Sequence, residues 1–281
     1  MREREAISSA DFNYIRDLVR DQSALTLESG KEYLLESRLD PLARTEGFPS
    51  CVHLVRRLRS SPFTDLHRKV VEAMTNNETT FFRDPRVFAM LANSVLPALI
   101  AARSAERSLN IWCAGCSAGQ EPYSVAMLLR EHRPSLDGWN IRIVASDISR
   151  DVLARGRAGR YSTIEINRGL PASRLVKYFA QDGAVWELAP DIRRMVEFRE
   201  INLIQSWQNL PAVHLIFMRN VLIYFDVAAK KSILEKAGQL LDPRGYLLLG
   251  GAETTTNLSD AFEPVSFGGA VCFRSRTSQP I

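Results

Sequence analysis

The stretch from Leu109 to Arg130 constrains the fold more than any other part of this sequence of 281 residues. A short apolar run leads into CAGCSAG, in which small residues separate two glycines, and a segment with helical apolar spacing follows. This order predicts a strand, a tight turn and the start of a helix. Glycines let the backbone approach a ligand closely, and a helix start offers unpaired N–H groups. We therefore expect a cofactor-binding turn at Gly115–Gly119.

From residue 109 onward, apolar runs of strand length alternate with helical segments. The runs lie at Leu109–Trp112, Ile141–Ala145, Val213–Met218 and Tyr246–Leu249, and the helical segments at Pro122–Glu131, Arg150–Gly156 and Ala228–Leu241. This alternation predicts a Rossmann-like α/β fold, a parallel sheet with helices on both faces. Turn residues interrupt it near 178–198, where we expect a small antiparallel β insert, and Gly268–Gly269 predicts a closing hairpin at 262–274.

The first 75 residues show helical spacing and no alternating pattern. Ser9 is placed to cap a first helix with Phe12 and Ile15 on its apolar face. A second helix is predicted over 31–45, with Tyr33 among its candidate buried residues. We expect an all-helical N-terminal domain over 1–75 and an α/β domain over 76–281.

Composition predicts a soluble, globular, cytoplasmic protein. Apolar residues make up 46% and charged residues 24% of the chain, and the net charge is +4. We find no apolar run of the ~18 residues that a membrane helix needs, so no membrane insertion is expected. The charged N-terminus does not resemble a signal peptide, and four cysteines do not suggest a disulfide framework.

The glycine turn also fits two other kinds of site. Its G-x-S-x-G pattern matches a nucleophile elbow with Ser117 as nucleophile. A triad would need a histidine on a late loop, but His214 lies inside an apolar run and is expected in a strand. Cys113 and Cys116 form C-x-x-C, which can bind zinc or act in redox chemistry. Because Cys51 and Cys272 stand alone, we favour small side chains in a tight turn, with no metal.

Polar residues follow the next strands. Asp147 ends the run IRIVASD, where an acid either accepts hydrogen bonds from ribose hydroxyls or caps the following helix. Asn220 and Tyr224 follow the run Val213–Met218, at an edge where open α/β sheets bind ligands. The segment MTNNETTFFR (74–83) has the composition of a capped linker, or of a polar strip facing the cofactor.

Together, these segments resemble the CheR-type chemoreceptor glutamate methyltransferases. The matching pieces are NETTFFRD (77–84), CAGCSAGQEPYS (113–124), ASDI (145–148), INL (201–203) and RNVLIYFD (219–226), in the order of the family. Gln120 departs from the pattern, because many members have glutamate there. The acid before the proline, Glu121, is retained.

The resemblance implies an enzyme that transfers a methyl group from S-adenosylmethionine to glutamate side chains on the cytoplasmic helices of chemoreceptors. The products are glutamyl methyl esters and S-adenosylhomocysteine. Arg83 and Tyr224 would lie nearest the transferred methyl, as catalytic residues. The residues expected around the cofactor are Asn77, Thr79, Arg83, Gly115, Glu121, Asp147, Asn202, Leu203, Arg219, Asn220 and Val221.

Charge distribution is compatible with an acidic receptor partner. Arginines in the helical domain could steer docking: Arg38, Arg44, Arg56, Arg57 and Arg59. Nucleic acid is not expected, since no aromatic residues are interleaved with them to stack bases. In some members the β insert grips a tethering peptide of the receptor; the short turn at Gly183 leads us to expect no such dependence. A non-catalytic, cofactor-sensing module is the remaining alternative, and the presence of both Arg83 and Tyr224 argues against it.

Overall fold

The computed structural model describes residues 6–28, 30, 32–208 and 210–276. These form two compact units. One holds the described residues up to Asn76 together with Tyr224–Ala229, and the other holds Asn77–Ile223 and the described residues from Lys230 onward. Each unit is described separately below.

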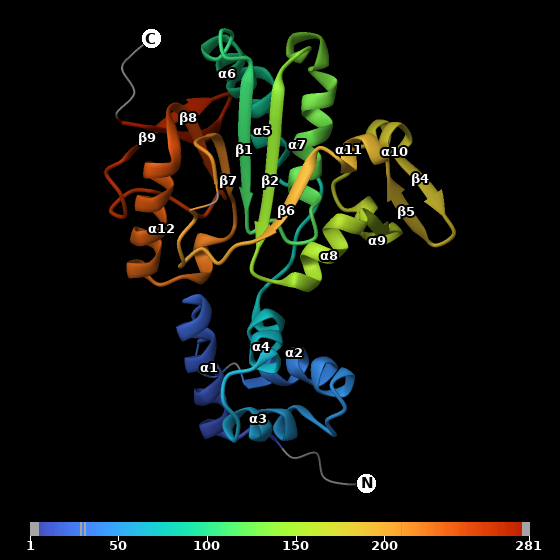
Figure 1. Cartoon of the computed structure of the whole chain (residues 1–281), viewed down its shortest axis with the longest axis vertical. Helices are drawn as coiled ribbons and strands as arrows, with labels where there is room; N and C mark the ends of the chain where they lie inside the picture. Colours follow the sequence, from blue (N-terminus) through green and yellow to red (C-terminus); the bar gives the residue numbers. More distant parts are fainter. Residues whose placement is uncertain (1–5, 29, 31, 209, 277–281) are drawn as a thin grey trace. The chain divides into compact units, whose positions relative to one another are not determined.

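The first unit contains four helices (Figure 1, blue to cyan). They are α1 (Ser9–Ser23), α2 (Glu32–Thr45), α3 (Cys51–Arg59) and α4 (Asp65–Met74). Ser8, one residue before the expected cap, accepts the Asp11 N–H and caps α1. Phe12 and Ile15 are buried as predicted. The prediction for Tyr33 was wrong, because its side chain is 64% exposed and Leu35 takes the buried position on α2.

The second unit is built on a seven-stranded sheet in the order β6-β2-β1-β7-β8-β10-β9. Its strands are β1 (Ser108–Ala114), β2 (Asn140–Asp147), β6 (Val196–Glu200), β7 (Val213–Met218), β8 (Leu241–Leu249), β9 (Phe262–Phe267) and β10 (Ala270–Ser275). The first five in the spatial order are parallel, whereas β10 is antiparallel to both β8 and β9. The predicted parallel sheet and closing hairpin are confirmed.

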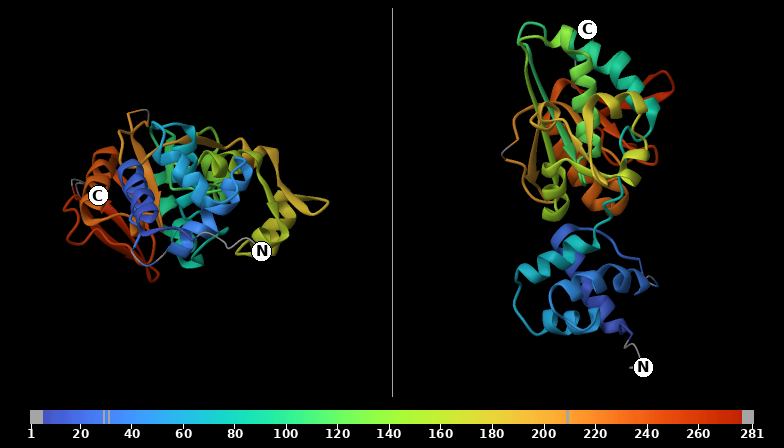
Figure 2. Two further views of the ribbon diagram at one scale, coloured as in Figure 1. Left: turned by 90° about the horizontal axis from the view of Figure 1, so that it is seen from below. Right: turned by 90° about the vertical axis from the view of Figure 1, so that its right-hand side faces the viewer.

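Helices cover both faces of this sheet (Figures 1 and 2). The helices around it are α5 (Pro85–Met90), the π-helical turn η1 (Leu91–Val95), α6 (Leu96–Ala102), α7 (Gln120–Glu131), the 3-10 turn η2 (Arg133–Leu136), α8 (Arg150–Ala158) and α12 (Val227–Leu240). The units β1-α7-β2 and β7-α12-β8 run in opposite directions across the sheet. Because parallel crossovers are right-handed, α7 and α12 lie on opposite faces. The topological switch therefore falls between β1 and β7.

The antiparallel insert is present but differs in extent from the prediction. It pairs β3 (Arg160–Ser162), β5 (Val185–Leu188) and β4 (Phe179–Asp182), with the short helices α9 (Thr163–Asn167), α10 (Ala172–Tyr178) and α11 (Pro190–Arg193) beside it. It begins earlier than residue 178, and Val196–Glu200 belongs to the large sheet as edge strand β6. The turn residues of the insert could be predicted from the local sequence, but the pairing of β3 with the more distant β5 could not. In Figure 2, left, the insert (yellow) projects to one side.

The helical stretch Pro85–Ala102 is, in the described part of the chain, long and apolar enough to cross a membrane by length and composition alone. Arg86, Asn93 and Pro97 interrupt its apolar residues, so the sequence alone shows no continuous apolar run here. Its apolar side chains Phe88, Leu91 and Leu99 are buried in the core around the large sheet. The stretch is therefore a core helix of the α/β unit.

Candidate cofactor site

The turn after β1 adopts backbone conformations that favour glycine. Gly115 and Gly119 have φ angles of 67° and 93°. A Cβ atom on Gly115 would lie 2.5 Å from Cγ2 of Val221, so the turn packs directly against the loop that follows β7. Helix α7 begins immediately after Gly119, as predicted.

Strand register brings the ends of β1, β2 and β7 to one edge. Ala114 is level with Ser146, and Cys113 is level with both Ala145 and Phe217. The residues that follow these strands therefore lie side by side, as expected for the ligand-binding edge of an open α/β sheet.

Asp147 connects the turn to the start of α8. Its Oδ2 accepts the Ser117 N–H at 2.9 Å, and its Oδ1 accepts the Ser149 N–H at 3.0 Å. The carboxyl group is buried, and this burial raises the pKa of Asp147, against the effect of the backbone N–H donors. Each carboxylate oxygen can accept a further hydrogen bond, so holding the turn and binding ribose hydroxyls are compatible roles.

The segment after Asn76 lies against the glycine turn. Ser117 Oγ donates to the Asn77 carbonyl at 2.7 Å, and the Phe82 N–H donates to Ser124 Oγ at 2.9 Å. Phe81 and Phe82 are buried within the α/β unit. The polar strip and the glycine turn therefore form one structure, although the segment taken alone favours a capped linker.

Arg83 sits between two left-handed residues, Phe82 with φ 47° and Asp84 with φ 61°. Such conformations cost about 1–3 kcal/mol each in residues other than glycine and cluster at functional sites. Within the described residues, the half-buried Arg83 guanidinium makes one hydrogen bond, to the Glu78 carbonyl at 3.5 Å. Its hydrogen-bonding capacity is thus largely unused.

Arg219 lies between two carboxylates. Its Nη1 donates to Glu121 Oε2 at 3.1 Å, and its Nη2 pairs with Asp84. Burial raises the pKa of Glu121, and the positive charges of Arg219 and Arg83 oppose that rise. A buried charge requires such a partner, so these three residues fix one another in place.

Two buried side-chain oxygens at this edge have no hydrogen-bond partner among the described residues. They are Asn220 Oδ1, after β7, and Gln120 Oε1, in the first turn of α7. Buried acceptors are rarely left unpaired in a native structure. These two atoms suit a ligand that brings amino or hydroxyl donors.

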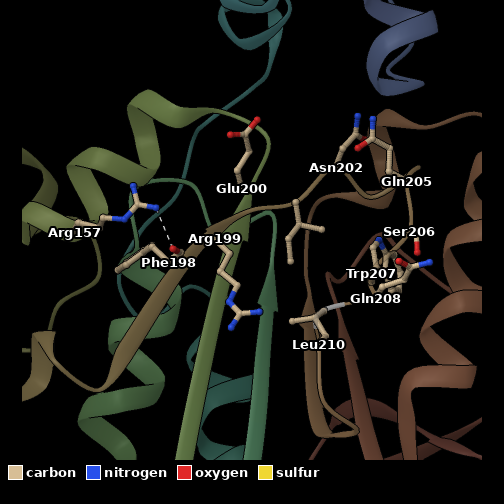
Figure 3. A pocket seen from close by; sticks show the side chains of 11 residues that line it. Arg157, Phe198, Arg199, Glu200, Asn202, Gln205, Ser206, Trp207, Gln208 and Leu210 are labelled. Carbon is tan, nitrogen blue, oxygen red and sulfur yellow. Dashed lines mark hydrogen bonds between the residues drawn. The ribbon is translucent and has the colours of Figure 1, made fainter.

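Asn202 and Leu203 follow the edge strand β6. The Ile201 N–H donates to the Asp147 carbonyl, so this segment begins beside the end of β2. A pocket of about 720 Å³ lies here, and its lining includes Asn202, Gln205, Ser206, Trp207, Gln208 and Leu210 (Figure 3). Lys236 of α12 holds the segment, since its Nζ donates to the carbonyls of Leu203 (2.6 Å) and Gln205 (2.8 Å).

Tyr224 groups with the helical unit. Its hydroxyl accepts the Asn76 Nδ2–H at 2.7 Å, and its carbonyl accepts the Thr26 N–H at 3.0 Å. Its closeness to the transferred methyl stays a prediction, as do the ligand contacts of the other predicted residues, including the half-buried Thr79.

The alternative chemistries lose support from geometry. His214 lies in β7, where it is buried and its Nδ1 accepts the Asn110 N–H at 2.8 Å. Burial lowers the pKa of this imidazole, and the Ser117 hydroxyl is engaged by a carbonyl. Burial also raises the pKa of the Cys113 and Cys116 thiols well above their usual range, which disfavours the reactive thiolate.

Sequence reasoning missed two side chains that hold site loops, Lys236 and Glu253. Glu253 follows β8, and its carboxylate accepts backbone N–H groups from two loops. Its position in GGAETTTN, directly beyond the apolar run of β8, was the available signal.

The fold and the site together define a class. The features are a sheet with five parallel strands, an antiparallel hairpin at one edge, a glycine turn after β1 and an acid at the end of β2. Together they describe a Rossmann-like domain that binds a nucleoside cofactor. The unpaired acceptors, the Asp147 carboxylate and the close-packed Gly115 fit the hydroxyl and amino donors of S-adenosylmethionine.

Comparison with known proteins identifies the family. Residues 77–270 match the model "CheR methyltransferase, SAM binding domain", and residues 10–75 match "CheR methyltransferase, all-alpha domain". Chemotaxis protein methyltransferase 1 of Pseudomonas aeruginosa is 40% identical over 96% of this chain and 99% of its own length. Chemotaxis protein methyltransferase Cher2 of Pseudomonas putida is 38% identical over 95% and 98%. Among solved structures, a glycopeptide N-methyltransferase complexed with S-adenosyl-L-methionine matches 68% of this chain and 56% of its own at 16% identity and a TM-score of 0.38.

The chain belongs to the CheR methyltransferase family, and its methyl donor is S-adenosylmethionine. The resemblance that the motifs indicated is thus confirmed.

Replacing Gly115 with alanine should abolish measurable binding of S-adenosylhomocysteine, because the new Cβ collides with Val221 and displaces the turn. Gly183→Ala is the matched control: Gly183 also has a positive φ, 61°, but nothing lies within 4 Å of its added Cβ. Both variants carry similar backbone strain, so calorimetry isolates the steric effect. Equal affinities in the two variants would contradict the role of the close-packed turn.

Proposed function

We propose that this chain methylates glutamate side chains on the cytoplasmic helices of chemoreceptors and thereby sets receptor adaptation. The products are γ-glutamyl methyl esters and S-adenosylhomocysteine, and the enzyme acts in the cytoplasm. Two findings support the substrate class: the close, nearly full-length relatives are chemotaxis methyltransferases, and the site edge carries a half-buried arginine with spare donors.

A glutamate acceptor matches the side chains available. Its carboxylate has an ordinary pKa of about 4.3, so it is already a nucleophile near neutral pH and needs no general base. S-adenosylmethionine supplies a methyl group activated by its positively charged sulfur. The protein must hold the attacking oxygen in line with that methyl, and such positioning can lower a barrier by roughly 7–11 kcal/mol.

Several of the predicted residues receive a role in this scheme. Arg83 holds the acceptor carboxylate by paired N–H donors, the geometry that a guanidinium favours. Asp147 accepts the ribose hydroxyls, and Asn220 accepts a donor of the cofactor at its unpaired oxygen. Tyr224 shapes the methyl pocket. Arg219 keeps Glu121 ionised and places Asp84, the neighbour of Arg83.

The function is tested with purified receptor cytoplasmic fragment and labelled S-adenosylmethionine. Base-labile label on the fragment, located to glutamate residues by mass spectrometry of peptides, is the expected result. Label on another residue type would overturn the proposed substrate. The same preparation titrated with a tether peptide tests our expectation that the insert needs none, which clear binding would refute.

Arg83→Ala should lower kcat by at least about 100-fold while cofactor affinity changes little, because a misplaced acceptor loses the in-line geometry. Arg86→Ala is the control, since Arg86 is an exposed arginine three residues further along. Initial rates with receptor fragment and calorimetry with S-adenosylhomocysteine measure the two effects. Full turnover in Arg83→Ala would exclude the orienting role.

Receptor docking is proposed through the end of α3. Of the five arginines considered, Arg59 pairs with Asp11 at 2.9 Å, and Arg38 donates to carbonyls at the end of α4. Arg44 donates to the Asp40 carbonyl. Arg56 and Arg57 are adjacent in the sequence and both exposed in the last turn of α3, and this pair of neighbouring positive charges at the surface carries the proposal.

Reversing these charges in the double variant Arg56→Glu, Arg57→Glu should raise the KM for receptor fragment severalfold, and the effect should shrink at high salt because surface charges are screened. Binding of S-adenosylhomocysteine should stay unchanged. Arg68→Glu, Lys69→Glu is the matched control, since both residues pair with Asp65 on α4. An equal rise in KM for both double variants would contradict docking at α3.

Acidification should weaken cofactor binding through Asp147. Burial raises its pKa, so the group protonates at a higher pH than an ordinary aspartate, and protonation removes acceptor capacity. Because the pKa of Asp147 is raised in the folded state, the contribution of this group to folding stability is lost as pH rises through that pKa. Rising pH should therefore strengthen cofactor binding and weaken folding stability. Calorimetry of S-adenosylhomocysteine across pH should show the loss of affinity at low pH, and Asp147→Asn should remove it. The exposed Asp182→Asn is the control; an unchanged pH profile in Asp147→Asn would contradict the assignment.

A further inference from the structure

The Glu253 carboxylate joins two loops at the site edge. Its Oε2 accepts the N–H groups of Gly250 (2.6 Å) and Asn220 (2.7 Å), and its Oε1 accepts those of Val221 (2.8 Å) and Ile223 (3.3 Å). Three of these donors follow β7, and one follows β8. Hydrogen bonds from N–H to a carboxylate are about twice as strong as neutral ones. One side chain thus fixes the path of the loop 220–223.

Asn220 is the residue that this arrangement constrains most. Its φ of 59° lies in the left-handed region, which asparagine tolerates better than most residues but does not prefer. Gly250 leaves it room, because a Cβ there would lie 2.7 Å from Asn220 Nδ2 and 2.8 Å from its backbone nitrogen. The Glu253 carboxylate therefore anchors the backbone of Asn220, and the absence of a Cβ on Gly250 leaves the space that Asn220 occupies.

The side chain held in this way ends in an atom without a partner. Asn220 Oδ1 is buried and accepts no hydrogen bond within the described residues. A backbone anchored by charged hydrogen bonds while its side-chain acceptor stays unpaired is the arrangement expected of a preorganised ligand contact. Glu253 itself points to the backbone, so it acts on a ligand only through Asn220 and its neighbours.

We propose that Glu253 is a positioning residue of the methyltransferase, which sets the Asn220 side chain for the cofactor. The inference rests on the proposed cofactor role of Asn220. Glu253 lies outside the five sequence motifs on which the resemblance to the family rests.

The test compares Glu253→Gln, Asn220→Ala and their double variant by calorimetry with S-adenosylhomocysteine. The amide of Glu253→Gln keeps the size of the side chain but turns an NH2 group towards backbone N–H donors. We expect affinity to fall about tenfold or more, because a buried donor of the ligand would no longer meet its acceptor on Asn220. Glu263→Gln is the matched control, because Glu263 forms one ion pair, with Arg274 on the neighbouring strand, and should bind normally.

A double-variant cycle separates positioning from a merely structural role. If Glu253 acts through Asn220, the double variant should lose no more affinity than Asn220→Ala alone. Additive losses would overturn the proposal, as would normal binding by Glu253→Gln when Asn220→Ala is impaired. Normal binding by Asn220→Ala would also overturn the proposal, because Asn220 would then have no role in cofactor binding. The proposed function would be unaffected, since methyl transfer to receptor fragment tests it separately.

Gly250→Ala gives a second approach should Glu253→Gln fold poorly. Its added Cβ would lie 2.7 Å from both Asn220 Nδ2 and Glu253 Oε2, so it displaces these two groups together while the charge of Glu253 is kept. The same non-additive loss with Asn220→Ala is therefore expected. Thermal melting of each variant sets a temperature at which all are folded for the calorimetry. Unchanged affinity in a folded Gly250→Ala would contradict the positioning of Asn220.

Discussion

The shared register of β1, β2 and β7 is the constraint on which the site depends. Parallel strands that end level with one another deliver their following residues to one edge, so Gly115, Asp147 and Arg219 become neighbours despite long separations in the chain. The strand order reverses between β1 and β7, so α7 and α12 lie on opposite faces of the sheet. Ligands bind at the carboxyl ends of the strands at such a reversal. A slip of one residue in either pairing would turn every side chain of a strand to the other face.

Carboxylates then fix the loops that the sheet brings together. Asp147 holds the glycine turn, Glu121 and Asp84 share Arg219, and Glu253 gathers N–H groups from two loops. Removing one partner from a buried pair leaves an uncompensated charge, at a cost of about 3–5 kcal/mol. Such a network keeps the loops from shifting. A reaction that depends on the positioning of its reactants requires loops fixed in this way. Arg83 differs, because among the described residues its guanidinium makes a single weak hydrogen bond, and we propose that its other donors bind the acceptor carboxylate.

The proposed reaction needs no general base. With an ionised acceptor carboxylate and an activated methyl donor, the proposed task of the protein is to bind and align them and to exclude water. The buried imidazole of His214 and the buried thiols of Cys113 and Cys116 serve packing and backbone hydrogen bonding. The positions of these side chains therefore argue against a serine hydrolase at Ser117 and against a zinc or redox site at Cys113 and Cys116.

Much of the fold could be predicted from local sequence. Strong apolar periodicity located β1, β2, β7 and α7, and the two glycines located the closing hairpin, because side-chain spacing and positive φ are local properties. The motifs indicated the family, which the comparisons confirm. Tyr33 failed as a buried residue because helical spacing alone does not fix which of two adjacent apolar faces packs inward.

Tertiary structure decided what depends on distant residues. The pairing of β3 with β5, the place of Val196–Glu200 at the edge of the large sheet and the burial of Pro85–Ala102 follow from long-range packing. The roles of Glu253 and Lys236 are of the same kind, since each binds backbone groups about thirty residues away. The position of Glu253 after β8 was visible in the sequence, but the groups that it binds were not. The sequence by itself determined the alternation of central strands and helices, the resemblance to the family and the position of the cofactor turn. The packed structure decided how the turn is held, because hydrogen bonds between loops exist only once the strands align.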